Sequence, residues 1–412
     1  MPNWQRNTYY QTGDNMKLNL EKYADVLIWG LTTARTQKFK KSDVILLRYE
    51  LPALSLAETV YARLVGMGFN VIPRAGITPV MEKGFYALSN ERQLTFRVPG
   101  NEELYKSLNG SIYLIAPACL THLAGIDPKR IGKTAVAQKY LRDILDKREE
   151  HGLFGWTLCM YPTDELAKHA GMSIDDYTSQ IAKAAFLNDK DPVARWKEVY
   201  GEVRQIKTRL NSMKVLEYRV ESANIDLVIT PGEMRKWIGI SGHNIPSFEI
   251  FLSPDWRGTK GVYYADQPSY RSGNLVKGLK LEFKGGRAVK IDAEEGAEFA
   301  RRQLSMDKGA CQVGEFSLTD KRFSKIDRFM ANTLFDENFG GKSGNCHIAV
   351  GASYSDTYSG DPAELDAGKK AALGFNDSAL HWDLVNTEKK IVTAKLKDGK
   401  TITVYENGIF IL

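Results

Sequence analysis

The sequence predicts an α/β N-terminal domain, with a parallel sheet and flanking helices, and an α+β, β-rich C-terminal domain. In the first half, short apolar runs alternate with segments of helical periodicity, as in strand–helix–strand units. After residue 218 this periodicity gives way to alternating strands and turn residues. We therefore assign residues 1–218 and 219–412 to two domains that share an interface, and a chain of 412 residues has the length of two or three domains.

Strands and helices alternate along the first half. The apolar run inside residues 43–49 is typical of a buried strand, and Leu56, Val60 and Leu64 fall on one face of a helix. Trp196 begins an apolar stripe along the last helix of this half. We predict strands at residues 43–49, 70–73, 111–118 and 155–160, and helices at residues 56–67, 136–148, 173–187 and 192–216.

The second half reads as short strands joined by turns. Asp398-Gly399 separates two strand-like runs and is a strong hairpin signal, because both residue types tolerate a positive φ. Asn407-Gly408 leads to a last strand in the same way. We predict strands at residues 220–230, 261–264, 279–284, 288–291, 391–397, 401–405 and 409–412.

Composition and charge exclude several classes of protein. The net charge of +6 is mild and the charged residues are interspersed, so we expect no nucleic-acid partner. No segment approaches the roughly 20 apolar residues of a membrane span, and Met1–Leu18 lacks the apolar core of a signal peptide. The scattered cysteines form no CxxC pair, which favours reduced thiols and a cytoplasmic location; they are Cys119, Cys159, Cys311 and Cys346.

Some segments resemble known sequence motifs but lack residues that those motifs require. Gly132-Lys133-Thr134 ends like a phosphate-binding loop, but Asp127 stands where that loop needs glycine, so we interpret the segment as a helix start. Neither HExxH nor GxSxG occurs. His122, His151 and His169 have no acidic residue that we expect to contact them, and we interpret them as surface or satisfied interior histidines.

A metal-binding pattern emerges in the second half. His381 and Asp383 stand two apart in an apolar strand-like stretch, so both side chains project from one face, with Trp382 on the other. Burying two polar groups on one face is costly unless something pairs them, and a metal ion would do so. His347 lies in another strand-like run, after a glycine-rich turn.

Three glutamates interrupt apolar sequence in the same half of the chain: Glu249, Glu315 and Glu337. With Asp383 they bring four negative charges, which two divalent cations would balance, while the two imidazoles bind as neutral ligands. Oxygen and imidazole donors suit Zn, Co, Mn or Mg, and the absence of thiolates argues against a closed structural zinc site. We therefore expect two divalent metal ions.

A pair of adjacent metal ions activates water and polarises a carbonyl or phosphoryl oxygen. Hydrolysis of peptides or amides and hydrolysis of phosphoesters both fit this chemistry, and the residues alone leave the choice open. A phosphoesterase predicts phosphate-binding cations near the ligands, for which Arg257 and Lys260 are candidates. A third alternative is a catalytically silent metal-binding homologue.

Several segments, in this order and spacing, resemble the aminopeptidase T / aminopeptidase S family of two-metal aminopeptidases. The most specific are Asn332-Thr-Leu-Phe-Asp-Glu337-Asn338 and His347-Ile-Ala-Val-Gly351; the others are Asn244-Ile-Pro…Glu249, Gly314-Glu315, Tyr354 and His381-Trp-Asp383. The resemblance implies a homodimer that releases N-terminal amino acids from peptides. It implies metal ligation by Glu249, Glu315, Glu337, His347, His381 and Asp383.

The resemblance also implies catalytic roles for Glu315, as a bridging ligand, and for Tyr354, whose phenol would donate a hydrogen bond to the oxyanion. Either Glu315 or Glu249 would carry the proton to the leaving amine. The sequence departs from the family in the long gap between Glu337 and His347, which its glycines would have to loop out, and in the bulky Trp382.

Overall fold

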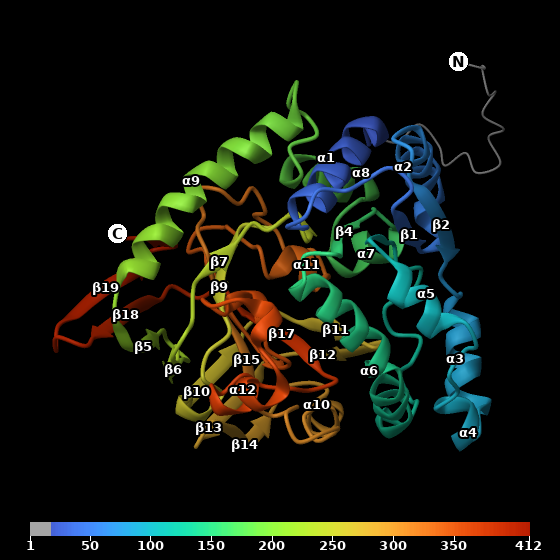
Figure 1. Ribbon diagram of the computed structural model, residues 1–412. Coiled ribbons are helices and arrows are strands. Elements are labelled where there is room, and N and C mark those ends of the chain that lie inside the picture. Colours follow the sequence, from blue (N-terminus) through green and yellow to red (C-terminus); the bar gives the residue numbers. More distant parts are fainter. Residues whose placement is uncertain (1–17) are drawn as a thin grey trace.

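The computed structural model describes residues 18–412 and confirms the predicted fold class (Figure 1). A parallel sheet with helices occupies the N-terminal part, and antiparallel sheets make up most of the C-terminal part. The prediction that Met1–Leu18 lacks a signal peptide falls, up to residue 17, outside the described residues. Among residues 18–412, no helix combines the length and apolar character that crossing a bilayer requires.

The parallel sheet has the strand order β2-β1-β3-β4-β8, and each neighbouring pair is parallel. Four of its strands match the predicted strands of the first half. The fifth, β8, comes from residues beyond 218, so the sheet draws on both sides of the predicted domain division. The strands are β1 (Val44–Tyr49), β2 (Asn70–Ala75), β3 (Gly110–Ile115), β4 (Gly155–Met160) and β8 (Asn244–Ile245).

Helices cover both faces of this sheet because its strands are apolar on both sides. Ile45 and Leu47 of β1 pack into the main core, which also contains residues of α1 and α2. Leu46, which points to the other face, packs in a second cluster with Leu104 of α5 and Leu145 of α6. The helices of this part are α1 (Leu20–Thr33), α2 (Leu54–Gly66), α3 (Pro79–Leu88), α4 (Glu91–Leu94), α5 (Asn101–Ser107), α6 (Pro128–Glu150), α7 (Asp164–His169), α8 (Ile174–Ala184) and α9 (Pro192–Ser212).

The segment Gly132-Lys133-Thr134 lies inside α6, which confirms its interpretation as helix and not as a phosphate loop. The helix starts earlier than predicted because Asp127 caps it: the Asp127 side chain accepts a hydrogen bond from the Lys129 amide, and Pro128 occupies the first turn.

The long helix α9 joins the two parts of the molecule through one aromatic stack. Trp196, fully buried as its stripe predicted, lies 5.7 Å from the Trp29 ring of α1 and 5.2 Å from the Phe248 ring. Its indole N–H donates to the Ala185 carbonyl. Phe248 directly precedes Glu249, so the stack ties the first of the predicted metal ligands to the N-terminal core.

The larger antiparallel sheet has the strand order β14-β13-β10-β6-β5-β18-β19-β20. One prediction here was wrong: residues 220–230 form a hairpin of two strands, not one strand. The chain turns at Ser222, whose amide donates to the Ile225 carbonyl and whose hydroxyl accepts from the Ile225 amide. The strands are β5 (Val215–Glu221), β6 (Asp226–Ile229), β10 (Lys260–Ala265), β13 (Leu279–Lys284), β14 (Arg287–Asp292), β18 (Ile391–Leu396), β19 (Thr401–Glu406) and β20 (Ile409–Phe410).

A second antiparallel sheet, of order β17-β16-β15-β9-β7, packs against the first. The Tyr263 hydroxyl of β10 lies 2.6 Å from the Leu384 carbonyl and 3.0 Å from the Cys346 carbonyl, which joins the two sheets. Its strands are β7 (Ile238–Gly239), β9 (Glu249–Leu252), β15 (Val313–Thr319), β16 (Asn345–Gly351) and β17 (His381–Asn386). The C-terminal part also contains the hairpin β11 (Ser269–Arg271) and β12 (Asn274–Val276), and the helices α10 (Ala297–Gln303), α11 (Thr333–Asp336), η3 (Ser355–Thr357) and α12 (Ala367–Ala372).

Candidate metal centre

The register of β15, β16 and β17 brings acidic and imidazole side chains onto one face of the sheet. Residues paired across antiparallel strands share a face, as do alternate residues along one strand. Glu315 and Asp383 both pair with Ala349, from opposite sides. His347 lies two positions before Ala349, and His381 two positions before Asp383, so all four functional side chains project the same way. The small Ala349 leaves room between the two carboxylates.

Glu249 joins this face from the first position of β9, where it pairs with Thr319 of β15. The ligand atoms of Glu249, Glu315 and His347 all lie within 4.8 Å of one another, and all three residues are buried. His347 Nε2 lies 3.0 Å from Glu315 Oε1 and 3.3 Å from Glu249 Oε2. These three residues form the centre of the cluster.

His381 and Asp383 extend the cluster toward solvent. His381 Nε2 lies 3.3 Å from Asp383 Oδ1 and 3.8 Å from Glu315 Oε2. Asp383 Oδ1 also lies 3.9 Å from His347 Nε2. Trp382 is buried on the opposite face and donates its indole N–H to Ser269. The prediction that His381 and Asp383 share one face is therefore confirmed.

The His381 ring is oriented by a backbone carbonyl. Its Nδ1 lies 2.9 Å from the Ala352 oxygen, so Nδ1 carries the proton and donates. Nε2, which faces Glu315 and Asp383, then holds the free lone pair that a metal ligand needs.

Glu337 approaches the same cluster from the end of α11. Its Oε1 accepts a hydrogen bond of 3.3 Å from the Asn244 side chain, and the residue is buried. The long gap before His347 closes on itself, because the Gly344 amide donates to the Gly340 carbonyl. Asn345, at the start of β16, donates to the Glu337 carbonyl at 2.8 Å. The glycine-rich loop thus returns β16 to the side of Glu337.

Tyr354 lies at the exposed edge of the cluster and is 37% exposed. Its ring centroid lies 4.8 Å from that of His381. Desolvation of the phenol and the charges of Glu315 and Asp383 raise the pKa of Tyr354 well above its ordinary value. The hydroxyl therefore keeps its proton and remains a hydrogen-bond donor at neutral pH.

Burial and mutual repulsion raise the pKa of two glutamates. Burial, together with the charge of Glu315, raises the pKa of Glu249 to about 8. Burial and the charge of Glu249 raise the pKa of Glu337 well above its ordinary value. In the absence of a cation, each of these side chains favours the neutral form.

The pKa values of the two imidazoles are also raised, which favours their charged form. Burial would lower the pKa of His347, but its hydrogen bond to Glu315 and the charge of Glu249 raise it to about 9. The pKa of His381 is also raised, because Asp383 outweighs the effect of burial. Burial would raise the pKa of Asp383, but the charge of His381 lowers it to about 2.

This donor set fits divalent cations. Among residues 18–412, no lysine or arginine forms an ion pair with the clustered carboxylates, which pair with His347 and His381. The positive charge of Arg271 also helps to lower the pKa of Asp383. Carboxylate oxygens and imidazole nitrogens are the ligands that Zn, Mn and Co accept in proteins, and the oxygens also suit Mg. A positive ion at this place would relieve the repulsion that raises the pKa of Glu249.

The other histidines lie outside the cluster, but the expectation that they lack acidic partners was wrong. His122 Nε2 lies 2.7 Å from Glu82, a residue distant in sequence that the fold brings close. His169 Nε2 lies 3.2 Å from Glu165, one helical turn earlier, a spacing that the sequence does show. His243, to which the sequence analysis gave no role, contacts Glu149 of α6 at 2.7 Å.

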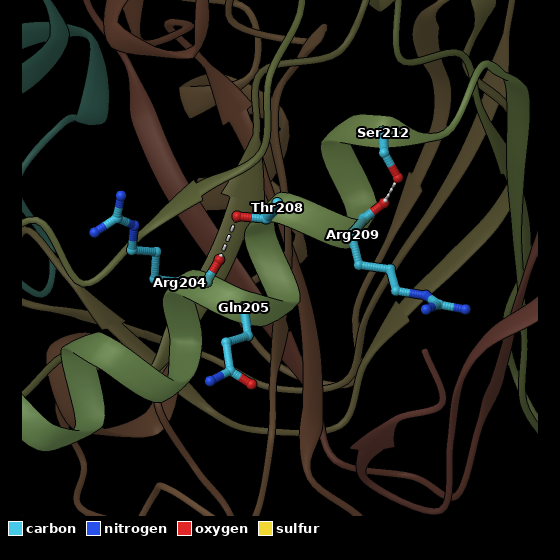
Figure 2. A pocket seen from close by; sticks show the side chains of 5 residues that line it. All are labelled: Arg204, Gln205, Thr208, Arg209 and Ser212. Carbon is cyan, nitrogen blue, oxygen red and sulfur yellow. Dashed lines mark hydrogen bonds between the residues drawn. The ribbon is translucent and has the colours of Figure 1, made fainter.

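A hollow of about 410 Å³ lies on one face of α9 and shares no residue with the cluster. Figure 2 shows that its two arginine side chains point away from one another, while Thr208 and Ser212 bond back to carbonyls of the helix. No side chain that lines it is a carboxylate or an imidazole, so its chemistry does not suit a cation. It is lined by Arg204, Gln205, Thr208, Arg209 and Ser212.

Cation binding at the cluster is expected to release protons. At pH 7 the pKa values of Glu249 (about 8) and His347 (about 9) leave both groups protonated in the metal-free protein. A bound cation displaces these protons, so its apparent affinity should rise between pH 6 and pH 9, by about tenfold per pH unit for each proton released.

Calorimetric titration of the metal-free protein with Zn²⁺, in buffers of different ionisation enthalpy, measures the number of protons released. An affinity that is unchanged across this pH range, with no proton release, would contradict the predicted protonation of Glu249 and His347.

Comparisons with known proteins agree with a metal-dependent peptidase. The family model described as thermophilic metalloprotease (M29) matches residues 16–410. Aminopeptidase T of Thermus aquaticus is 29% identical over 310 residues, which cover 70% of this chain and 74% of that protein. Aminopeptidase PepS of Streptococcus thermophilus is 25% identical and covers 97% of this chain and 99% of its own length.

A solved structure, wild-type AmpT from Thermus thermophilus, has the same fold. It superposes with a TM-score of 0.74 over 96% of this chain and 99% of its own, at 22% sequence identity. Because the family model spans nearly the whole chain, the chain belongs to the thermophilic metalloprotease (M29) family.

Proposed function

We infer that this protein is a metal-dependent aminopeptidase, which hydrolyses the first peptide bond of a peptide and releases the N-terminal amino acid. The observation that carries this inference is the buried cluster of Glu249, Glu315 and His347, whose ligand atoms lie within 4.8 Å of one another. Its donor chemistry suits a metal-assisted hydrolase. Membership of a metalloprotease family and relatives named aminopeptidases support the peptide bond as the target.

We propose that two divalent ions bind in the cluster and that Glu315 bridges them. The two oxygens of Glu315 support this role, because Oε1 faces His347 at 3.0 Å and Oε2 faces His381 at 3.8 Å. Four carboxylates would balance the charge of two dications. Zn, Co, Mn and Mg all accept these donors. The proposed ligands are Glu249, Glu315, Glu337, His347, His381 and Asp383.

When bound, such ions polarise the substrate carbonyl and make water acidic enough to attack at neutral pH. The protein supplies the remaining steps. Glu315 or Glu249 takes the proton of the attacking water and passes it to the leaving amine. The Tyr354 hydroxyl, which keeps its proton, donates a hydrogen bond to the oxyanion that forms on the substrate carbonyl.

The phosphoesterase alternative finds no support. Arg257 is held by Asp255 through two hydrogen bonds, of 2.8 and 2.7 Å, and so is not free to bind phosphate. Lys260 is exposed on β10, outside the sheet that carries the cluster. The relatives are named aminopeptidases. Only a measurement of peptide hydrolysis distinguishes an active aminopeptidase from a catalytically silent homologue.

Removing the charge of Glu315 tests the metal site. Because Glu315 contacts both imidazoles, Glu315→Gln should lose bound metal and lower hydrolysis of leucine p-nitroanilide by about 100-fold or more. Metal content is measured by elemental analysis, and p-nitrophenyl phosphate serves as the rival substrate. Glu198→Gln, on the exposed side of α9, is the matched control and should behave as wild type. Wild-type turnover in the folded Glu315→Gln protein would rule out this site.

Removing the Tyr354 hydroxyl tests its role as a donor to the oxyanion. Tyr354→Phe should lower kcat by roughly 100-fold and change KM little, because the hydrogen bond forms only as charge develops on the oxygen. The metal content should stay at the wild-type level, since Tyr354 is not among the proposed ligands. A rise in KM with kcat unchanged would assign Tyr354 to substrate binding instead.

We further propose that the protein is a cytoplasmic homodimer. The four cysteines are unpaired thiols, as expected in a reducing compartment. The helix α3 buries none of its residues, and exposed apolar residues occur both on this helix and in the segment that follows α4. The most exposed of them include Val80 at 82% and Leu88 at 86%, a pattern typical of an interface.

Charge placed on α3 tests the dimer. Sedimentation equilibrium should give twice the chain mass of 46.3 kDa for the wild type. The double variant Val80→Glu, Leu88→Glu should sediment as a monomer, because each glutamate would have to be buried in the interface. A matched pair of changes on the exposed side of α9, Glu198→Lys with Glu202→Lys, should leave the mass unchanged. A monomeric wild-type protein would overturn the proposal.

A further inference from the structure

Asp356 lies in a short turn beside the proposed catalytic tyrosine. The turn η3 (Ser355–Thr357) follows Tyr354 directly and is fixed at both ends. At its start the Tyr354 amide donates to the Ser253 hydroxyl at 2.8 Å. At its end the Lys236 amide donates to the Thr357 carbonyl at 2.8 Å. Asp356 is therefore held on a rigid element next to the metal cluster.

Asp356 is half-buried, and one of its carboxylate oxygens lacks the partners that a buried oxygen normally has. Its Oδ1 is buried and accepts no hydrogen bond. Among residues 18–412, no lysine, arginine or histidine lies within ion-pair distance of it. The buried acid Asp336 shows the usual arrangement, since its two oxygens accept from the Met330 and Asn332 amides. A buried carboxylate oxygen without a hydrogen bond lowers the stability of the fold, so we interpret it as the acceptor for a donor that a ligand brings.

The charge of His243 acts on Asp356, but the imidazole is hydrogen-bonded to other groups. Its Nδ1 lies 2.6 Å from the Ser241 hydroxyl, and its Nε2 lies 2.7 Å from Glu149 Oε1. Glu149 also accepts from the Trp156 indole at 3.2 Å. Both ring nitrogens of His243 are thus engaged, so the imidazole does not supply the missing hydrogen bond of Asp356.

The charges around Asp356 include that of Glu315, a proposed metal ligand. Burial raises the pKa of Asp356 to about 7; the charge of His243 lowers it, and the charges of Glu149 and Glu315 raise it. A carboxylate in this position gains most from a compact cation with several N–H donors. The free α-ammonium group of a peptide is such a cation, and it stands next to the bond that an aminopeptidase cleaves.

We propose that Asp356 binds the α-ammonium group of the peptide substrate and thereby restricts cleavage to the N-terminal bond. This assignment rests on the proposed aminopeptidase function and adds a specificity-determining residue to it. Tyr354 and Asp356 then act from one turn: the first meets the scissile carbonyl oxygen and the second meets the amino group on the adjacent carbon. His243 and Glu149 act as positioning residues that keep other donors away from Asp356.

The test compares a primary amine with its neutral counterpart. In wild-type protein, isopentylamine should inhibit hydrolysis of leucine p-nitroanilide, and it should bind more tightly than isopentyl alcohol, which has the same carbon skeleton. Asp356→Asn should weaken isopentylamine, and raise KM for the p-nitroanilide, by about tenfold or more, the loss expected for a hydrogen bond between charged groups. The affinity for isopentyl alcohol and the metal content should not change.

Two controls separate binding from folding and from net charge. Asp143→Asn removes the same charge from an exposed position of α6 and should bind the amine as wild type does. Asp356→Asn should melt no lower than wild type in the absence of amine, because the charge that it removes is unpaired. Should it fail to fold, Asp356→Glu keeps the charge but moves it, and should also raise KM.

The outcomes distinguish this inference from the proposed function. Equal binding of isopentylamine to the wild-type and Asp356→Asn proteins, measured by calorimetry, would overturn the role of Asp356 even if the enzyme cleaves peptides. Loss of amine binding in Asp356→Asn, with no peptide hydrolysed by the wild type, would support the ammonium site and overturn the aminopeptidase.

Discussion

Negative charge is held away from water on one face of a sheet, and this decides how the site is built. Glu249 and Glu315 are at most 6% exposed, and like charges at this depth repel strongly. His347 offsets only part of that repulsion, since one imidazole faces several carboxylates. The cluster is stable as an ionised group only with added positive charge, which is why its chemistry leads to metal ions.

The scaffold holds these groups in place with amides, which add no charge. The Asn338 side chain donates to the Leu334 carbonyl and accepts from the Phe248 amide, and so fixes the segments before Glu249 and after Glu337. The Asn345 side chain holds the glycine-rich loop by donating to the Glu337 and Phe339 carbonyls. A lysine or arginine in these places would neutralise the carboxylates and compete with a metal ion. Neutral supports leave the full negative charge available to the cation.

Local periodicity was enough to predict part of this site. The spacing of His381 and Asp383 fixes their common face whatever the fold, because side chains alternate along any strand. The boundaries of most strands in the parallel sheet followed from apolar runs in the same way. Glu249 and Glu315 come together through strand order and register, which no local pattern contains. Their proximity could be predicted only from charge balance and family resemblance.

Other features could not be predicted because they depend on contacts between distant segments. Asp356 stands among serines and threonines in a turn, and nothing near it in sequence marks its Oδ1 as buried. Its importance comes from Glu149 and His243, which belong to α6 and to the chain before β8. The hairpin at Ser222 was missed for a related reason, since a side chain that caps a tight turn replaced the glycine that usually signals one.

The helix α6 gives the N-terminal part a direct role at the site. A helix that packs on one core usually carries an apolar stripe, but the surface of α6 is polar instead. The reason is that α6 spans the space between the parallel sheet and the segment before β17. Arg142 bonds to the Ser378 carbonyl, and Glu150 pairs with Lys370 of α12 at 2.8 Å. These contacts fix the chain that leads into His381 from the same helix that carries Glu149. A shift of α6 would therefore move the proposed ligand His381 together with Glu149 and His243, so the N-terminal part of the chain helps to set the geometry of the site.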